Sequence, residues 1–259
     1  MNHLDKLLKM QLESLIGSIS TIDRLEEQGG TSIVHQVITK SGTYLLKSSF
    51  KEKYREWLQA EAIVLEKLVS QSIIPVPHYY GFLEEQNSSH LIMSFEQGIT
   101  LTTALAQAKT DTAKLPLIKS LGQLLHKLHS TEIKEPFHHS DEWLSERLQK
   151  AEYYVRNGWT EGSNELLTLL VKNKPLKVKQ TIIHGDCTTD NVLVVNGTVT
   201  KFIDVAGMTV GDPRYDEALA IRSFVHDKKL KNAFYEGYKH YKITLDEFRY
   251  FDEGLYEFF

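Results

Sequence analysis

The chain has 259 residues, of which 41% are hydrophobic and 25% are charged, as is typical of a globular protein. Its formal net charge of −4 excludes the positive excess that nucleic-acid binding requires, so we expect no nucleic-acid partner. A single cysteine, Cys187, rules out an internal disulfide, and no apolar run approaches the roughly 18 residues of a membrane helix, so we expect a cytoplasmic protein without a membrane partner.

The first third of the chain has the pattern of short strands around one helix. Two β-rich runs at 33–38 and 43–47 flank Lys40-Ser41-Gly42, which predicts a hairpin. Apolar residues at helical spacing then predict a helix over 52–69, and a further strand is expected at 91–95.

The pattern changes after Gly98, where the strand signal almost vanishes. Helical spacing of apolar residues predicts helices at 101–108, 115–128, 142–155 and 164–171. We therefore expect an α+β protein with a small β-rich lobe at 1–97 and a larger, mainly helical lobe at 98–259.

Polar residues gather around a second predicted hairpin. Asn196-Gly197 lies between two β-branched runs and predicts a type I′ turn. Counting back from this turn pairs Asn191 with Phe202, so Asn191 and Asp204 should meet at the open end, with Asp186 on the incoming loop. Such oxygen donors suit Mg²⁺ and a polar acceptor. Asp and Asn also commonly cap turns, so a single such residue would not indicate a site.

The spacing His184-x-Asp186-x-x-x-x-Asn191 is that of the kinase catalytic loop. Through HGDCTTDNVLV and IDVAGMTVGDPRYDEALA, the chain resembles the aminoglycoside phosphotransferase and choline kinase family of protein-kinase-like small-molecule kinases. The resemblance implies a two-lobed protein-kinase-like fold, with Asp186 as catalytic base or positioner of the acceptor hydroxyl. It also implies that Asn191 and Asp204 bind the Mg²⁺ that bridges the nucleotide phosphates. His184 is expected to orient the backbone, and Asp216 to brace the catalytic loop.

Further nucleotide contacts are implied in the first lobe. Glu61 lies on the inward stripe of its helix, where a carboxylate needs a buried cation. The family places a strand lysine there to hold the α and β phosphates, and we expect Lys47 to end its strand on the face of Leu45. A shortened phosphate-covering loop and a base-reading hinge complete the set, and side chains at the hinge do not distinguish ATP from GTP. The residues assigned to the nucleotide are Lys47, Glu61, Gly29, Gly30, Thr31, Ser32, Ser94 and Glu96.

The carboxyl terminus is the candidate acceptor surface. Thr244-x-x-Glu247 has the form of a capping box, which opens a helix expected to reach Phe259. Its apolar stripe would be Phe248, Phe251, Leu255 and Phe258, with Asp246, Tyr250, Glu253 and Glu257 opposite. The acidic face is either solvated or, as the resemblance implies, lines a pocket for a polycationic sugar. The residues assigned to the acceptor are Asp246, Glu253, Glu257 and the terminal Phe259.

Three functions remain open. The first is an ATP-dependent O-phosphotransferase that moves the γ-phosphate to a hydroxyl of an aminoglycoside-like antibiotic. The second is a housekeeping kinase for choline, a thiosugar or an amino sugar. The third is a nucleotide-binding pseudokinase, which the full set of expected site residues disfavours. Val205-Ala206 replaces the Phe-Gly of protein kinases after Asp204, which disfavours a protein substrate. The residues leave the acceptor, its reacting hydroxyl and the oligomeric state undetermined.

Overall fold

The computed structural model describes residues 6–26, 28–69, 73–138 and 142–259. The chain divides into two compact units, Met1–Gln97 and Gly98–Phe259. Among the described residues, no helix is long and apolar enough to cross a membrane.

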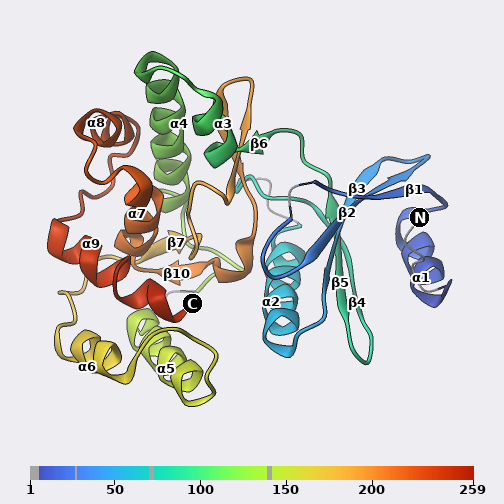
Figure 1. The fold of residues 1–259 in the computed structure, drawn as a ribbon, viewed down its shortest axis with the longest axis horizontal. Helices are drawn as coiled ribbons and strands as arrows, with labels where there is room; N and C mark the ends of the chain where they lie inside the picture. Colours follow the sequence, from blue (N-terminus) through green and yellow to red (C-terminus); the bar gives the residue numbers. More distant parts are fainter. Residues whose placement is uncertain (1–5, 27, 70–72, 139–141) are drawn as a thin grey trace. The chain divides into compact units, whose positions relative to one another are not determined.

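The first unit contains a five-stranded antiparallel sheet with the strand order β1-β2-β3-β5-β4 (Figure 1). Two of these strands were not expected from the sequence. β1 is an edge strand and is mostly exposed, and β4 carries an irregularity between Tyr79 and Gly81, so neither shows a clean alternation of apolar residues. The strands are β1 (Ile19–Arg24), β2 (Ile33–Thr39), β3 (Thr43–Ser49), β4 (Tyr79–Glu84) and β5 (Ser89–Ser94).

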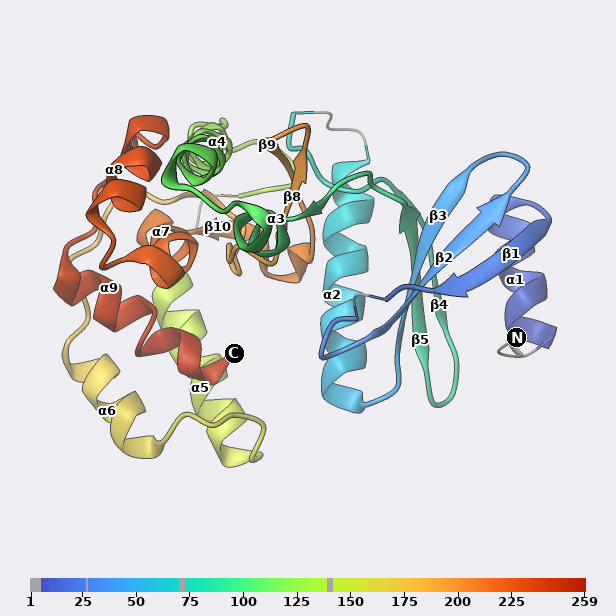
Figure 2. The same cartoon turned by 45° about the horizontal axis from the view of Figure 1, so that its top comes forward.

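One helix covers each face of this sheet (Figure 2). The predicted helix is α2 (Glu52–Leu68), which packs against β3, β4 and β5. On the other face lies α1 (Lys6–Ile16), which sequence reasoning missed although its buried residues recur every four positions. These residues form a hydrophobic cluster with one face of the sheet. The fully or nearly buried members are Leu8, Leu12, Ile16, Val37, Tyr44, Leu46 and Ile92.

The second unit is mainly helical, and its first four helices lie close to their predicted ranges. They are α3 (Leu101–Gln107), α4 (Asp111–His129), α5 (Trp143–Arg156) and α6 (Asn164–Lys172). Later helices are α7 (Pro213–Ile221), α8 (Lys228–Gly237) and α9 (Leu245–Phe251), with short 3₁₀ turns η1 (Val205–Gly207), η2 (Arg222–Phe224) and η3 (Leu255–Phe258). Two small sheets flank the loop predicted to be catalytic. They consist of β6 (Ile99–Thr100), β8 (Val192–Val195) and β9 (Thr198–Phe202), and of β7 (Thr181–Ile183) and β10 (Thr209–Gly211).

The β8–β9 hairpin has the predicted turn but not the predicted register. Asn196 and Gly197 both have positive φ, at 50° and 76°, as a type I′ turn requires. A bulge between residues 193 and 194 places one extra residue on β9, so Phe202 pairs with Val192. The expected pairing of Phe202 with Asn191 was therefore wrong by one residue.

The carboxyl-terminal segment, residues 244–259, is not one continuous helix. The expectation that the helix opened by Thr244 reaches Phe259 was therefore wrong. α9 has the predicted capping box at Thr244 but ends at Phe251, and η3 follows after Gly254. The predicted apolar stripe is buried, as expected. Tyr250 was expected to face outward, but it is buried as well. Its hydroxyl donates to the carbonyl oxygen of Leu170 at 3.0 Å. α9 is thus covered on two sides, since it also packs against α7.

Candidate active site

Asp186 lies on the loop between β7 and β8, and two side chains hold its carboxylate. Oδ1 accepts a hydrogen bond from the Tyr256 hydroxyl at 3.0 Å, and Oδ2 accepts one from Asn191 Nδ2 at 2.8 Å. Asn191 Nδ2 also donates to the backbone oxygen of Asp186 at 2.9 Å. Because each carboxylate oxygen has its own donor, the side chain is held in one orientation.

The surroundings of Asp186 raise the pKa of its carboxyl group above the ordinary value. Burial is the main cause that raises its pKa, and the charge of Asp204 acts in the same direction. His184 and the hydrogen bonds from Tyr256 and Asn191 oppose this rise in the pKa. A carboxylate with a raised pKa is a better acceptor for the proton of a hydroxyl group.

His184 serves the backbone of the loop through both of its ring nitrogens. Nε2 donates to the carbonyl oxygen of Ile203 at 2.9 Å, and Nδ1 accepts from the amide of Asp186 at 3.2 Å. Since both nitrogens are engaged, the ring offers no lone pair to a metal. The next residue, Gly185, has φ of +83°, and a Cβ there would lie 2.3 Å from the carbonyl oxygen of Gly207. Only glycine fits this close approach of two backbone segments.

Asp216 braces the same loop from α7. Its carboxylate accepts the amide of His184 at 2.6 Å and that of Gly185 at 2.8 Å, which confirms the structural role expected of it. His129 on α4 donates from Nε2 to Asp216 at 3.3 Å, and its Nδ1 lies 2.8 Å from the Tyr238 hydroxyl. The sequence did not indicate His129 or Tyr238, because His129 is far along the chain from both of its partners, Asp216 and Tyr238.

Asn191 and Asp204 have the chemistry of a Mg²⁺ site. Asn191 directs its amide nitrogen to Asp186, which leaves Oδ1 as the atom that would face a cation. Asp204 is exposed and has φ 56° and ψ 53°, a left-handed conformation that is uncommon outside glycine. Strain of this kind is often retained where a side chain must point in one direction. Mg²⁺ commonly takes only one or two protein oxygens besides water and phosphate oxygens, so these donors fit it.

In the first unit, Lys47 and Glu61 form a buried ion pair. The distance from Lys47 Nζ to Glu61 Oε2 is 2.6 Å, and the two residues are only 9% and 3% exposed. Leu46 faces the α1 cluster, so Lys47, the next residue along β3, faces α2. The sequence had indicated that Lys47 ends its strand. β3 instead continues to Ser49, so Lys47 lies inside the strand.

The glycine-containing segment joins β1 to β2. Gly29 and Gly30 are exposed, and a Cβ at either would meet nothing within 4 Å, so packing does not require glycine there. The far end of the segment is tied to β3, because Ser49 Oγ donates to the carbonyl oxygen of Thr31 at 3.2 Å and lies 2.7 Å from Ser32 Oγ.

The predicted hinge follows β5. The amide of Ser94 donates to the carbonyl oxygen of His78 at 2.8 Å, and the Ser94 hydroxyl donates to Glu96. Because this amide is engaged, any contact of Ser94 with a nucleotide base would have to use its carbonyl oxygen.

The four residues assigned to the acceptor do not lie together. Asp246 has a side chain that is 96% exposed, and it lies 3.7 Å from Arg249. Glu253 and Glu257 are exposed at the other end of the segment, near Asp252. Burial raises the pKa of Asp252 to about 6, and the charges of Glu253 and Glu257 contribute to this.

The terminal Phe259 packs against an arginine. The Arg147 guanidinium lies 3.6 Å from the centre of the Phe259 ring, and Arg147 Nη2 donates to the Tyr215 hydroxyl at 3.4 Å. Arg147 falls in the helical stretch where the sequence offered no functional motif, so it was not singled out.

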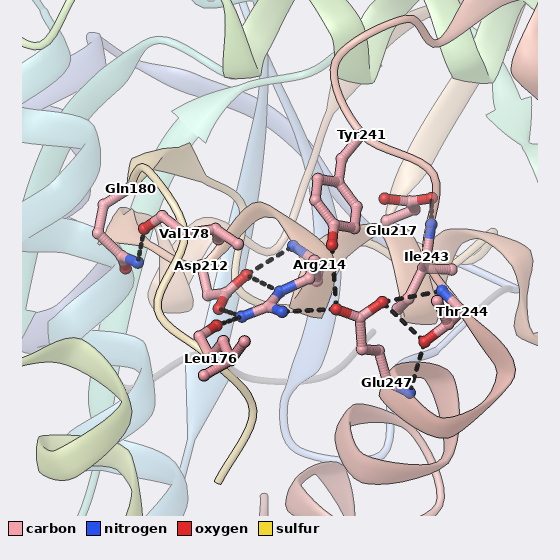
Figure 3. Close-up of polar contacts among 10 residues, drawn as sticks. All are labelled: Leu176, Val178, Gln180, Asp212, Arg214, Glu217, Tyr241, Ile243, Thr244 and Glu247. Carbon is pink, nitrogen blue, oxygen red and sulfur yellow. Dashed lines mark hydrogen bonds and ion pairs between the residues drawn. The ribbon is translucent and has the colours of Figure 1, made fainter.

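A buried arginine anchors the carboxyl-terminal segment (Figure 3). Arg214 is 2% exposed and makes two hydrogen bonds to the carboxylate of Asp212, at 3.0 and 2.6 Å. It also donates to Glu247 Oε1 at 2.6 Å and to the carbonyl oxygen of Leu176 at 2.8 Å. Sequence reasoning recognised Asp212 and Glu247 only as helix caps, because nothing local indicates that one arginine joins them.

Comparisons with known proteins show which proteins this chain is similar to. The family model described as the phosphotransferase enzyme family matches residues 27–251. The aminoglycoside 3′-phosphotransferase of Niallia circulans is 28% identical over 200 residues, which cover 72% of this chain and 73% of that protein. The enzyme of the same name from Streptomyces fradiae is 27% identical over 224 residues, covering 78% and 80%. That of Enterococcus faecalis is 26% identical over 168 residues, covering 60% of this chain and 61% of that protein.

Solved structures share the fold. An aminoglycoside 3′-phosphotransferase of type VIII matches with a TM-score of 0.76 at 22% identity, covering 98% of this chain and 100% of that one. An aminoglycoside phosphotransferase from Streptomyces rimosus, solved with ADP and streptomycin, matches with a TM-score of 0.71 at 17% identity, covering 96% and 97%. The predicted protein-kinase-like fold class is confirmed.

Proposed function

The chain belongs to the phosphotransferase enzyme family as a small-molecule kinase, and from this premise we propose that it phosphorylates an aminoglycoside antibiotic with ATP. The observation that carries the proposal is the catalytic loop. Its carboxylate, Asp186, is held by Tyr256 and Asn191, while Asp216 accepts hydrogen bonds from the backbone amides of His184 and Gly185. Phosphoryl transfer depends mainly on such positioning and on charge neutralisation.

Asp186 would act on the acceptor. Its carboxylate accepts a hydrogen bond from the acceptor hydroxyl and takes the proton as the hydroxyl oxygen forms a bond to the γ-phosphorus. The bond between this phosphorus and the bridging oxygen breaks, and ADP leaves. Asn191 Oδ1 and Asp204 would hold Mg²⁺, which would neutralise charge on the phosphate oxygens when bound.

The nucleotide contacts are proposed for the first unit. Lys47, kept in place by Glu61, would bind the α and β phosphates. The backbone of Gly29, Gly30, Thr31 and Ser32 would cover the phosphates, and Ser94 and Glu96 would contact the base. ATP is the proposed donor because neighbouring structures contain ADP. We propose the cytoplasm as the compartment, since ATP is available there and Cys187 is a free thiol.

The names of the relatives support an aminoglycoside acceptor. Three of them are called aminoglycoside 3′-phosphotransferases, and one neighbouring structure contains streptomycin. We assign Glu253, Glu257 and Phe259 to the acceptor, because they belong to the segment that carries Tyr256 to Asp186. Asp246 is set apart, since it lies at the opposite end of the segment beside Arg249.

The test compares two antibiotics that differ in one hydroxyl. Kanamycin B carries a 3′-hydroxyl, and tobramycin is its 3′-deoxy analogue. The purified protein is incubated with Mg²⁺ and either ATP or GTP, and the products are examined by mass spectrometry and ³¹P NMR. We expect phosphorylated kanamycin B and unmodified tobramycin, with ATP as the better donor.

The other outcomes are equally informative. Phosphorylation of both antibiotics would keep the antibiotic class and show that a hydroxyl other than the one at the 3′ position accepts the phosphate. Transfer to choline or glucosamine in parallel reactions, with neither antibiotic modified, would make the protein a metabolite kinase. Nucleotide binding without transfer to any of these acceptors would contradict the proposed function.

A further inference from the structure

A residue of the carboxyl-terminal segment, Tyr256, makes a hydrogen bond to Asp186. Among the residues that the structure describes, no other residue of this segment does so. Tyr256 lies in η3, 70 residues from the catalytic loop, and its hydroxyl donates to Asp186 Oδ1 at 3.0 Å. Asn191 donates to the other oxygen at 2.8 Å. The carboxylate is therefore held from opposite sides by the loop itself and by a distant segment of the chain.

The Tyr256 ring has its own supports. The Arg222 guanidinium lies 4.8 Å from the centre of the ring, and the ring of Tyr215 lies 6.5 Å away, centre to centre. Arg222 in turn lies with Nε 3.1 Å from Oδ1 of the buried Asp252. Asp252 and Arg222 thus stabilise the position from which the hydroxyl reaches Asp186.

The anchor of the whole segment lies at the start of α9. There Glu247 both closes the capping box of Thr244 and accepts a hydrogen bond from the buried Arg214 (Figure 3). The segment from α9 to η3 is consequently attached at both ends, at Arg214 and at Asp186. A tyrosine carried by such a segment has little freedom to turn away from the carboxylate.

We propose that Tyr256 is a positioning residue for phosphoryl transfer, which fixes the orientation of the Asp186 carboxylate toward the acceptor hydroxyl. The inference rests on the proposed function, because it assigns Asp186 to the acceptor. A carboxylate oxygen has two lone pairs, so the hydrogen bond from Tyr256 leaves Oδ1 able to accept a second one from the acceptor. Loss of this hydrogen bond lets the carboxylate rotate and lowers the fraction of molecules in the reactive geometry.

The test uses Tyr256→Phe, which removes the hydroxyl and keeps the ring against Arg222. Tyr250→Phe is the matched control, because it also removes one tyrosine hydroxyl from this segment but breaks only a bond to Leu170. Transfer to kanamycin B and hydrolysis of ATP without acceptor are measured for both variants. We expect Tyr256→Phe to lower kcat on the order of 10-fold with an unchanged KM for ATP. Tyr250→Phe should lower only the melting temperature.

A spectroscopic measurement tests the contact independently of turnover. The side-chain carboxyl ¹³C signal of Asp186, identified by its absence in Asp186→Asn, should shift in Tyr256→Phe and not in Tyr250→Phe. A kcat for Tyr256→Phe equal to that of the parent would overturn the inference. A kcat above that of the parent would also overturn it, because it would show that Tyr256 blocks the base. If the parent protein transfers phosphate to no acceptor, the proposed function fails, and an unshifted ¹³C signal would overturn the contact separately.

Discussion

Several separate segments of the chain position Asp186 and the loop around it. Asn191 comes from the loop itself, Asp216 from α7 and Tyr256 from η3. His184 ties the loop to the end of β9 through Ile203. Asp186 is proposed to activate the acceptor, whereas Lys47 and Asp204 are proposed to bind the nucleotide and its Mg²⁺. Substitutions at single residues should separate these two tasks.

Asp186→Asn tests the activation of the acceptor. The amide keeps the shape of the side chain but cannot take a proton from the acceptor, so transfer should fall by a factor on the order of 10² to 10⁴. Affinity for ATP should hardly change. Asp190→Asn is the control, because Asp190 is exposed on the same loop. Steady-state kinetics with varied ATP measure both effects, and a large loss of ATP affinity with normal turnover would reverse the assignment.

Asp204→Asn tests the metal site. The variant loses the carboxylate proposed to bind Mg²⁺, so the gain in ATP affinity that Mg²⁺ confers should be lost. Isothermal titration of ATP with and without Mg²⁺ measures this gain directly, without reference to turnover. Asp190→Asn again serves as the control and should bind like the parent. An undiminished Mg²⁺ effect in Asp204→Asn would remove the metal assignment.

Lys47 is tested by a pair of variants because its ion pair with Glu61 is buried. Lys47→Met takes this partner from Glu61, and the free energy of unfolding should fall on the order of 1–3 kcal/mol. ATP affinity should fall as well. The double variant Lys47→Met with Glu61→Leu replaces the pair by apolar side chains, which often restores stability. If the double variant is stable and also binds ATP normally, Lys47 does not contact the phosphates.

At the scale of the element, the segment from Thr244 to Phe259 differs most from its prediction. A regular helix would place Tyr250, Glu253 and Glu257 on one exposed face. α9 instead ends at Phe251, and of these three side chains Tyr250 is buried while Glu253 and Glu257 are exposed. The segment still buries its whole apolar stripe, so the hydrophobic pattern determined the contacts although the helix is interrupted.

The exposed acids of this segment should act on a cationic acceptor. Glu253→Gln with Glu257→Gln removes two negative charges near Asp252, so the KM for kanamycin B should rise and depend less on salt. Asp246→Asn removes a charge from the other end and should change neither quantity. Acceptor saturation at low and high salt gives the comparison. Equal effects of Asp246→Asn and the double variant would mean that general surface charge, not a local site, attracts the acceptor.

At the scale of the whole molecule, a buried carboxylate links α7, α8 and the loop before α9 in the second unit. Glu217 on α7 accepts hydrogen bonds from the Tyr235 hydroxyl of α8 at 2.6 Å and from the amide of Ile243 at 2.7 Å, both through Oε1. Its Oε2 is buried with no hydrogen-bond partner among the described residues. Burial is the main cause that raises the pKa of Glu217 to about 7.

This raised pKa predicts that stability falls with rising pH. Between about pH 4.5 and pH 7 the unfolded chain has lost the proton of Glu217 while the folded one retains it, so the free energy of unfolding decreases over this window. Glu217→Gln removes the titration and keeps an acceptor for Tyr235 and Ile243. The variant should match the parent at pH 4 and exceed it at pH 8 on the order of 1–3 kcal/mol.

Urea unfolding at the two pH values measures this difference. Asp252 has its pKa raised by burial to about 6 and contributes a slope of the same sign, but it is present in both proteins and cancels. Parallel pH profiles for the parent and Glu217→Gln would show that Glu217 is ionised in the folded state.

The local sequence by itself determined the parts of this protein that depend on neighbouring residues. The catalytic-loop spacing, the turn at Asn196-Gly197, the capping box at Thr244 and the helical stripe that buries Glu61 could all be predicted, because each follows from backbone geometry over a few residues. The resemblance that they carry identified the family and the fold.

The tertiary structure alone decided which distant side chains meet. Tyr256 reaches Asp186 across 70 residues, Glu247 reaches Arg214 across 33, and His129 reaches Asp216 across 87. Such contacts arise when whole elements pack, and no local pattern encodes them. The bulge in β8–β9 and the end of α9 are of the same kind, because packing on more than one side overrides the regular period on which a prediction from sequence depends.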